Sequence, residues 1–233
     1  MKHRFLPVLL ILFPLLSQAQ KIEIGINIAP TISYRFSQPS SEISSRAESI
    51  RIAERPIHTF DFGIDIRNKI TDRIKIGSAL VYSQKGFANT NPPATYNNSE
   101  LSKMNSIDYV QDYIEIPLFA TYDYFQDKKI NAFAMVGINN SILLNAKNNL
   151  IVKAGEVSDE DYKTLTAPYL KSSKIHNIGM IAGTGLLVNV NDKTAIGLEA
   201  QTKFMFTPLE EIFFATQRRL FSAGLNFRFI KKL

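Results

Sequence analysis

The sequence contains no cysteine, and only His58 and His176 remain among its histidines once the amino-terminal segment is set aside. Without cysteine the chain can form neither a disulfide framework nor a thiolate metal site, and it cannot carry a lipid on an amino-terminal cysteine. The two histidines are 118 positions apart, which matches no spacing of metal ligands. We therefore expect neither a metal site nor a cofactor.

A concentrated run of basic residues is also absent. Lysine and arginine number 27 against 21 aspartates and glutamates, a formal net charge of +6. This excess of six falls to four if Lys2 and Arg4 are removed with the amino-terminal segment. Nucleic-acid-binding domains gather basic side chains into a patch or stripe, whereas scattered charges are typical of a solvated surface. The sequence therefore predicts no nucleic-acid partner.

Hydrophobic runs long enough for a membrane helix are missing, and the longest apolar run opens the chain. Phe5 to Leu16 is a stretch of 12 residues after the basic MKHR, whereas a spanning helix needs about 20. Ser17 and Ala19 supply the small residues of a cleavage site ahead of Gln20. We predict a secretory signal peptide at residues 1–19 and an exported domain at residues 20–233, which is either soluble or inserted as strands.

The exported part alternates apolar and polar residues with a period of two, which indicates β-strands. The clearest example is Ile22 to Ile28, in which every second residue is isoleucine. Eight such runs occur, and they are Lys21–Phe36, Ile57–Ile70, Arg73–Phe87, Tyr109–Phe125, Ile130–Leu144, Lys174–Val190, Thr194–Phe206 and Arg219–Phe229. The fifth is the weakest, because Phe133 and Met135 share a face with asparagines.

The connections between these runs alternate in length. Three are tight turns rich in Asn, Asp and Lys, namely Asn68–Asp72, Gln126–Lys129 and Asn191–Lys193. Four are long, namely Ser37–Pro56, Ala88–Asp108, Asn145–Ser173 and Thr207–Arg218. An even number of antiparallel strands with short periplasmic turns and long extracellular loops is the plan of an outer-membrane β-barrel. We predict an all-β, eight-stranded transmembrane barrel located in the cell outer membrane, with outer-membrane lipid around it.

The direction of the alternation separates this barrel from a soluble one. A lipocalin-like barrel points its apolar residues inward around a ligand, whereas a membrane barrel has an apolar outside and a polar lumen. Here the apolar faces are nearly continuous, and the opposite faces mix small residues with single charges, which suits a narrow polar interior. In the last run, Phe221 to Phe229 alternate in this way and end on an aromatic residue. Such a closing strand is similar to the signal read by the outer-membrane assembly machinery, which we expect as a partner during insertion.

Two stretches carry a more specific likeness. VYSQKGF (Val81 to Phe87) ends the third run, and YIEIPLFATYDY (Tyr113 to Tyr124) fills the fourth. With GLNFRF near the end, they resemble the PorT-like outer-membrane β-barrel family of Bacteroidota. The resemblance implies the barrel fold and the outer-membrane location, and it favours a role in an envelope or secretion assembly. In the fourth run Pro117 cannot donate to a strand ladder, so it marks a bulge or a local break in pairing.

The inward faces of the eight runs carry nearly balanced charges. The acidic residues are Glu23, Asp61, Asp65, Glu115 and Glu199, and the basic residues are Arg35, Arg67, Lys75, Lys85, Lys203 and Arg228. Eight strands leave room only for side chains, so we interpret these residues as a structural charge network that closes the lumen. The alternative interpretation is a path for protons or ions.

The function predicted from the sequence is structural or binding rather than enzymatic. The alternative is an enzyme with an active site at the outer rim, performing acyl transfer or proteolysis, with His58 or His176 beside a serine. No nucleophile motif supports it, and we predict no catalytic residues. Long loops commonly carry binding sites, and Ile212, Phe213 and Phe214 form an apolar cluster in the last loop. They form either a patch that contacts an envelope protein partner or the ends of the neighbouring strands.

Overall fold

The computed structural model describes residues 22–38, 54–89, 104–152, 174–208 and 217–233. The predicted signal peptide and the cluster of Ile212, Phe213 and Phe214 lie outside this part of the chain. The regular structure within it consists of nine β-strands. No helix in the described segments is long and apolar enough to cross a membrane.

Eight long strands correspond to the eight predicted runs. They are β1 (Ile22–Gln38), β3 (Ile57–Lys69), β4 (Ile74–Asn89), β5 (Met104–Gln126), β6 (Ile130–Val152), β7 (His176–Asn191), β8 (Thr194–Met205) and β9 (Gln217–Lys232). The ninth, β2 (Glu54–Arg55), lies in a segment predicted as loop and pairs with the end of β4.

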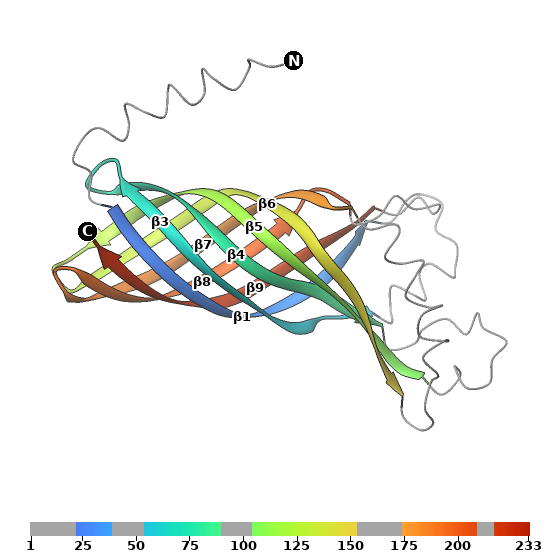
Figure 1. The fold of residues 1–233 in the computed structure, drawn as a ribbon. Coiled ribbons are helices and arrows are strands. Elements are labelled where there is room, and N and C mark those ends of the chain that lie inside the picture. The colour runs from blue at the N-terminus through green and yellow to red at the C-terminus, as the bar shows by residue number, and fades with distance from the viewer. Residues whose placement is uncertain (1–21, 39–53, 90–103, 153–173, 209–216) are drawn as a thin grey trace, which may run out of the picture.

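The eight long strands close into a barrel (Figure 1). Their order around the wall is β4-β3-β1-β9-β8-β7-β6-β5, and a further pairing of β4 with β5 closes the ring. Every pairing is antiparallel. The predicted eight-stranded antiparallel barrel is therefore confirmed.

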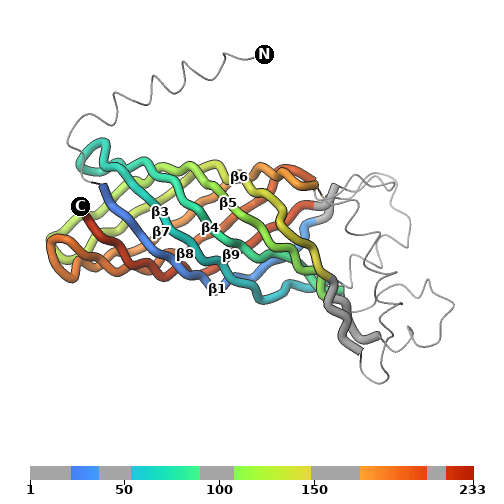
Figure 2. The backbone as a smooth tube through the Cα atoms, in the orientation of Figure 1, coloured from blue at the N-terminus to red at the C-terminus, as the bar shows by residue number. Residues whose placement is uncertain are grey.

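The strands are staggered by ten residues around the barrel, because a path along paired residues leaves β1 at Glu23 and returns to it at Ser33. Its successive partners are Arg67, Gly77, Phe119, Gly137, Ile181, Lys203 and Ser222. Such a stagger tilts the strands against the barrel axis, as Figure 2 shows. With eight strands, the interior is just wide enough for side chains to fill.

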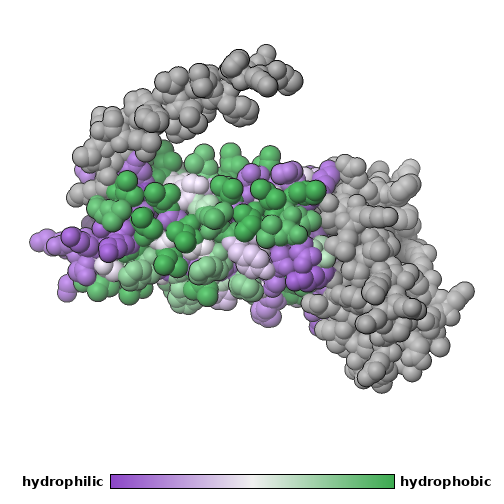
Figure 3. Space-filling model, viewed as in Figure 1, coloured by the Kyte–Doolittle hydropathy of each residue, from purple (hydrophilic) through white to green (hydrophobic). Residues whose placement is uncertain are grey.

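The outer wall of the barrel is apolar and exposed. Leu118 on β5 and its paired neighbour Ile138 on β6 are 62% and 61% exposed, respectively. On the face shown in Figure 3, hydrophobic side chains predominate along the middle of the described wall, with more hydrophilic ones toward both ends. Large apolar residues on a water-exposed wall would be costly, whereas hydrocarbon accepts them. This side-chain arrangement is that of a membrane barrel and excludes the lipocalin-like alternative.

Two strands extend well beyond their predicted ends. β5 and β6 each have 23 residues, and they stay paired as far as Met104 and Val152. β6 pairs with β7 only as far as Ile142 and His176, so the two strands project beyond the wall at the long-loop end (Figure 1). The predicted run ended at Leu144, and the asparagines and lysine that follow are poor strand formers. Pairing with β5 overrides this weak local preference.

Candidate functional site

In the structure, all eleven charged residues predicted for the lumen face inward and are buried. None of these residues is more than 7% exposed. They fall into separate groups along the barrel rather than one continuous column, and each group contains both signs of charge.

At the long-loop end, Arg35 on β1 forms an ion pair with Glu54 of β2. The Arg35 guanidinium carbon also lies 3.6 Å from the centre of the Phe87 ring on β4. Phe87 in turn stacks on Tyr109 of β5, with ring centres 4.6 Å apart. Glu54 was not predicted as a partner because its segment carries no strand pattern. The short strand β2 therefore brings a carboxylate to the long-loop end of the lumen.

Below this pair lies the outer charge network, made of Asp61, Lys85, Glu115 and Lys203. The Lys203 ammonium donates to Asp61 and to Glu115, both at 2.6 Å, and Lys85 donates to Glu115 at 2.5 Å. Ser83 donates to Asp61 at 2.7 Å, and Ser141 donates to Glu115 at 3.1 Å. Two cations and two carboxylates make the group neutral. Buried charges are tolerated when they are paired and hydrogen-bonded in this way.

The inner charge network contains Asp65, Arg67, Glu199 and Arg228. Arg67 donates to Asp65 at 2.8 Å, and the Arg228 side chain lies 2.8 Å from a Glu199 oxygen and 3.5 Å from Asp65. The Arg67 guanidinium also faces the rings of Phe119 and Phe133, with its carbon 5.4 and 5.5 Å from their centres. This group is neutral as well.

At the short-turn mouth, Lys75 binds two carboxylates. Its ammonium donates to both Glu23 oxygens, at 3.0 and 3.1 Å, and lies 3.5 Å from Asp123. Asp123 was missed by the sequence analysis, although its odd position on the run Tyr113–Tyr124 gives it the same inward face as Glu115. The odd position of Asp123 on this run was therefore enough to predict that its side chain faces the lumen.

The lumen also contains apolar layers, which the sequence analysis did not predict. One cluster, toward the short-turn end, consists of Phe119, Phe133, Met135, Ile181, Leu187, Ala195 and Ile230. The other, toward the long-loop end, consists of Phe87, Tyr113, Met205 and Leu220. Their positions explain the weak fifth run, since Phe133 and Met135 point into the barrel and not toward lipid. The prediction of a lumen filled only by small and charged side chains was incomplete.

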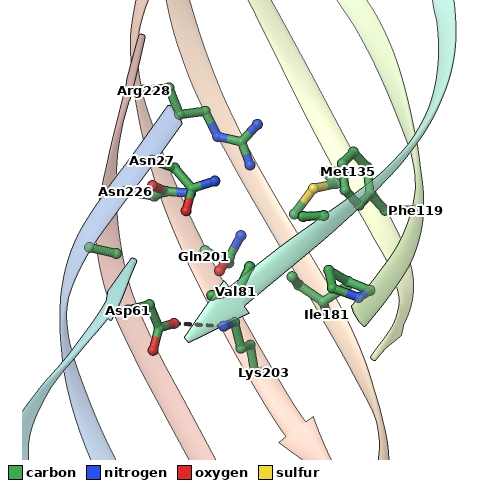
Figure 4. A pocket seen from close by; sticks show the side chains of 13 residues that line it. Asn27, Asp61, Val81, Phe119, Met135, Ile181, Gln201, Lys203, Asn226 and Arg228 are labelled. Carbon is green, nitrogen blue, oxygen red and sulfur yellow. Dashed lines mark hydrogen bonds and ion pairs between the residues drawn. The ribbon is translucent and has the colours of Figure 1, made fainter. Parts of the chain in front are cut away.

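Between the two networks lies a small cavity of about 20 Å³. Figure 4 shows Asp61, Gln201, Lys203, Asn226 and Arg228 on one side of it and Phe119, Met135 and Ile181 on the other, and Val81 also lines it. A cavity needs about 10–15 Å³ to hold one water molecule, so this space is of single-water size. The described lumen holds no passage of the kind that lets solutes cross a porin.

The two histidines considered for an enzyme do not share a site. His58 on β3 and His176 on β7 both lie on outward faces and are exposed. β3 and β7 are four strands apart in the ring of eight, in either direction. The histidines therefore lie on opposite sides of the barrel, and a catalytic group cannot contain both.

Pro117 interrupts the ladder between β4 and β5, which resumes at Ser78–Leu118 and Val81–Glu115 on either side of it. The predicted break in pairing is confirmed.

On the outer wall, Asp112 accepts hydrogen bonds from Tyr82 at 2.9 Å and Gln84 at 3.1 Å, and lies 3.3 Å from the Lys147 ammonium. This polar group, unrecognised in the sequence, ends the apolar wall at the long-loop side.

Comparison with known proteins identifies the kind of barrel. A family model described as an outer membrane protein beta-barrel domain matches residues 17–213. No curated protein matches the sequence. Similar solved structures include OprG of Pseudomonas aeruginosa, which is 8% identical with a TM-score of 0.48 and is matched over 91% of this chain and 96% of that chain. They also include Neisserial surface protein A (12%, TM-score 0.43, 89% and 95%) and outer membrane protein W of E. coli (13%, TM-score 0.37, 90% and 98%). These identities are too low to transfer a function.

Proposed function

The chain belongs to the outer membrane protein beta-barrel domain family, and we propose that it serves as a closed membrane anchor that binds an envelope partner on its outer side. The observation that carries the proposal is the filled lumen. Two neutral charge networks alternate with two apolar clusters across the barrel, and the cavity between the networks measures about 20 Å³. A barrel that does not conduct must act through its ends or its wall.

The long-loop end is the better candidate for the binding surface. β5 and β6 continue beyond the wall there, and β4 supports them as far as Asn89, which pairs with Ile107. β2 pairs with Ala88 and Asn89 of β4, on the edge opposite β5. Such a ribbon gives the adjoining loops a rigid base, and loops on a rigid scaffold are common binding sites.

We extend the proposal to a PorT-like barrel in an envelope or secretion assembly. Its support is the pair of motifs VYSQKGF and YIEIPLFATYDY together with the barrel architecture. The apolar cluster of Ile212, Phe213 and Phe214 is the proposed contact with the partner protein. A large apolar group rimmed by polar residues is typical of such contacts.

Crosslinking in intact cells, followed by mass spectrometry of the captured proteins, tests the binding function. We expect the wild type to capture a defined envelope protein and a Phe213→Asp, Phe214→Asp variant to lose it. A matched variant with Tyr96→Asp and Tyr162→Asp, in two other long loops, should retain it. Identical capture by wild type and the Phe213, Phe214 variant would refute the contact.

Planar-bilayer recording tests the closed lumen separately. We expect no steady conductance from the pure protein, since side chains meet across the interior. Ohmic conductance of porin size would contradict the anchor function, whatever the crosslinking result. Loss of a lipid or peptide modification in His58→Ala or His176→Ala cells would instead favour an enzyme with a rim site.

A further inference from the structure

The short-turn end of the barrel carries an excess of basic side chains. Apart from the buried group of Lys75, Glu23 and Asp123, the described residues at this end include seven basic and three acidic ones. The basic residues are Lys69, Arg73, Lys128, Lys129, Lys193, Lys231 and Lys232, and the acidic residues are Asp72, Asp127 and Asp192. The four long connections, residues 37–56, 88–108, 145–173 and 207–218, contain nine basic and eleven acidic residues. The positive charge of the protein is therefore concentrated at the end that faces the periplasm.

These basic residues are spread around the whole circumference. They lie at the β3–β4, β5–β6 and β7–β8 turns and where the end of β9 meets the start of β1. In the barrel order, these four corners recur at every second strand. Lipid headgroups surround the wall completely and so meet all four corners. The distribution therefore fits lipid.

Two of the basic side chains lie at the lipid-facing wall rather than over the mouth. Arg73 donates a hydrogen bond to the hydroxyl of Tyr122 at 3.4 Å, and Tyr122 is an exposed residue of the outer wall. Lys231 follows Phe227 and Phe229 on the outward face of β9. Long basic side chains at the edge of an apolar wall extend their charged ends to the headgroup level. The aromatic neighbours mark the same level.

Four ammonium groups at this end have no partner among the residues that the structure describes. Lys69 pairs with Asp72 at 2.8 Å, and Lys232 donates to Asn189 at 2.7 Å. In contrast, the side chains of Lys128, Lys129, Lys193 and Lys231 form no ion pair or hydrogen bond with any residue that the structure describes. All four are exposed. They are therefore free to bind an external anion.

We propose that Arg73, Lys128, Lys129, Lys193 and Lys231, the basic ring, bind the phosphates of anionic phospholipids in the periplasmic leaflet. The ring then surrounds the barrel with an anionic lipid shell on this side only. Each basic residue near a membrane surface strengthens the attraction to anionic lipid about fivefold, the equivalent of ~1 kcal/mol. The attraction is electrostatic, so it weakens at high salt, where the Debye length falls to about 3 Å at 1 M. This inference does not depend on the function proposed above.

The test uses the full barrel in bilayers of mixed phosphatidylglycerol and phosphatidylethanolamine, with either lipid spin-labelled. Electron paramagnetic resonance measures the share of each label that the protein immobilises. For the wild type we expect the anionic label to be enriched about fivefold in the lipid shell, and the enrichment to disappear in 1 M NaCl. A Lys128→Gln, Lys129→Gln, Lys193→Gln, Lys231→Gln variant should lose most of it. Its matched control, Lys103→Gln, Lys153→Gln, Lys163→Gln, Lys171→Gln, changes the same charge in the long connections and should keep it.

Three results would overturn the proposal. The first is equal enrichment in the wild type and the basic-ring variant, and the second is an equal loss in the control. The third is displacement of the labelled lipid by inorganic phosphate at low millimolar concentration, which would indicate a site for free phosphate. If the fourfold variant does not fold, Lys128→Gln, Lys129→Gln alone serves, and we expect a partial loss. No change in that variant would equally refute the inference.

Discussion

Glu115 offers the sharpest test of how the lumen is stabilised. Its carboxylate is fully buried and accepts hydrogen bonds from Lys85, Lys203 and Ser141. Replacement by glutamine keeps the shape and removes one negative charge from the outer charge network. Lys203 then keeps the Asp61 carboxylate at 2.6 Å, whereas Lys85 loses its carboxylate partner and keeps only neutral acceptors, the Ser83 hydroxyl at 2.9 Å and the amide oxygen of the glutamine.

The expected cost follows from the charge that is left unpaired. Removal of one partner of a buried ion pair costs about 3–5 kcal/mol, so Glu115→Gln should lower the free energy of unfolding by that amount. Lys85→Met should cost a similar amount, because it leaves the network negative. The double variant is neutral again and retains the pair of Lys203 with Asp61. Its cost should fall short of the sum of the single costs by about 3 kcal/mol, the upper end of measured couplings.

The measurement is guanidinium unfolding of the barrel refolded in lipid vesicles. The sequence contains no tryptophan, so circular dichroism and the gel mobility of the folded form should follow the transition. Asp72→Asn is the matched control, because Asp72 is 94% exposed in its pair with Lys69; an exposed pair contributes less than about 1 kcal/mol. The expected coupling between Glu115 and Lys85 would be refuted if the losses of unfolding free energy in the two single variants simply added in the double variant. It would also be refuted if each single loss were as small as that of the control.

Other predictions concern the wall and the strand contacts. Leu118→Arg, in the exposed apolar wall, should lower the stability of the inserted barrel by about 2–4 kcal/mol, and Ile24→Arg near the short-turn end by about 0–1 kcal/mol; equal losses in vesicle unfolding would contradict the assigned membrane position. Gly86→Ala should cost about 1–3 kcal/mol, because a Cβ there overlaps the Tyr109 carbonyl oxygen. Gly197→Ala should cost less by the same unfolding assay, since the end of the flexible Leu187 side chain is its nearest contact.

The wall of the barrel could be predicted from the sequence because one solvent determines it. In lipid, outward positions must be apolar and every strand must be paired, so a period of two recurs in all eight strands. Ile22 to Ile28 shows this requirement directly, and the structure places its isoleucines outward. Strand ends are set differently. β6 continues past Leu144 through residues of low strand preference because β5 offers it a partner.

Contacts across the lumen could not be predicted in the same way. Lys203 and Asp61 are 142 positions apart, and their contact depends on the stagger of all eight strands. A change of register in one pairing would bring different side chains to the same height. The odd or even position of a residue along its strand identifies which charges face inward, and it would have identified Asp123 as well. It does not identify which charges meet, or that Phe133 and Met135 lie between charged groups.

The apolar layers and the charge networks together explain why the interior is closed without being uniform. A barrel in lipid cannot place its polar groups outside, so its interior has to accept charge. An unpaired charge there would be costly, and the outer and inner networks each contain two cations and two carboxylates. Phe119 and Phe133 lie against the Arg67 guanidinium and fill the space beside it. A lumen filled by these side chains leaves only a cavity of about 20 Å³, so the proposed recognition is assigned to the long-loop end and to the basic ring at the opposite end.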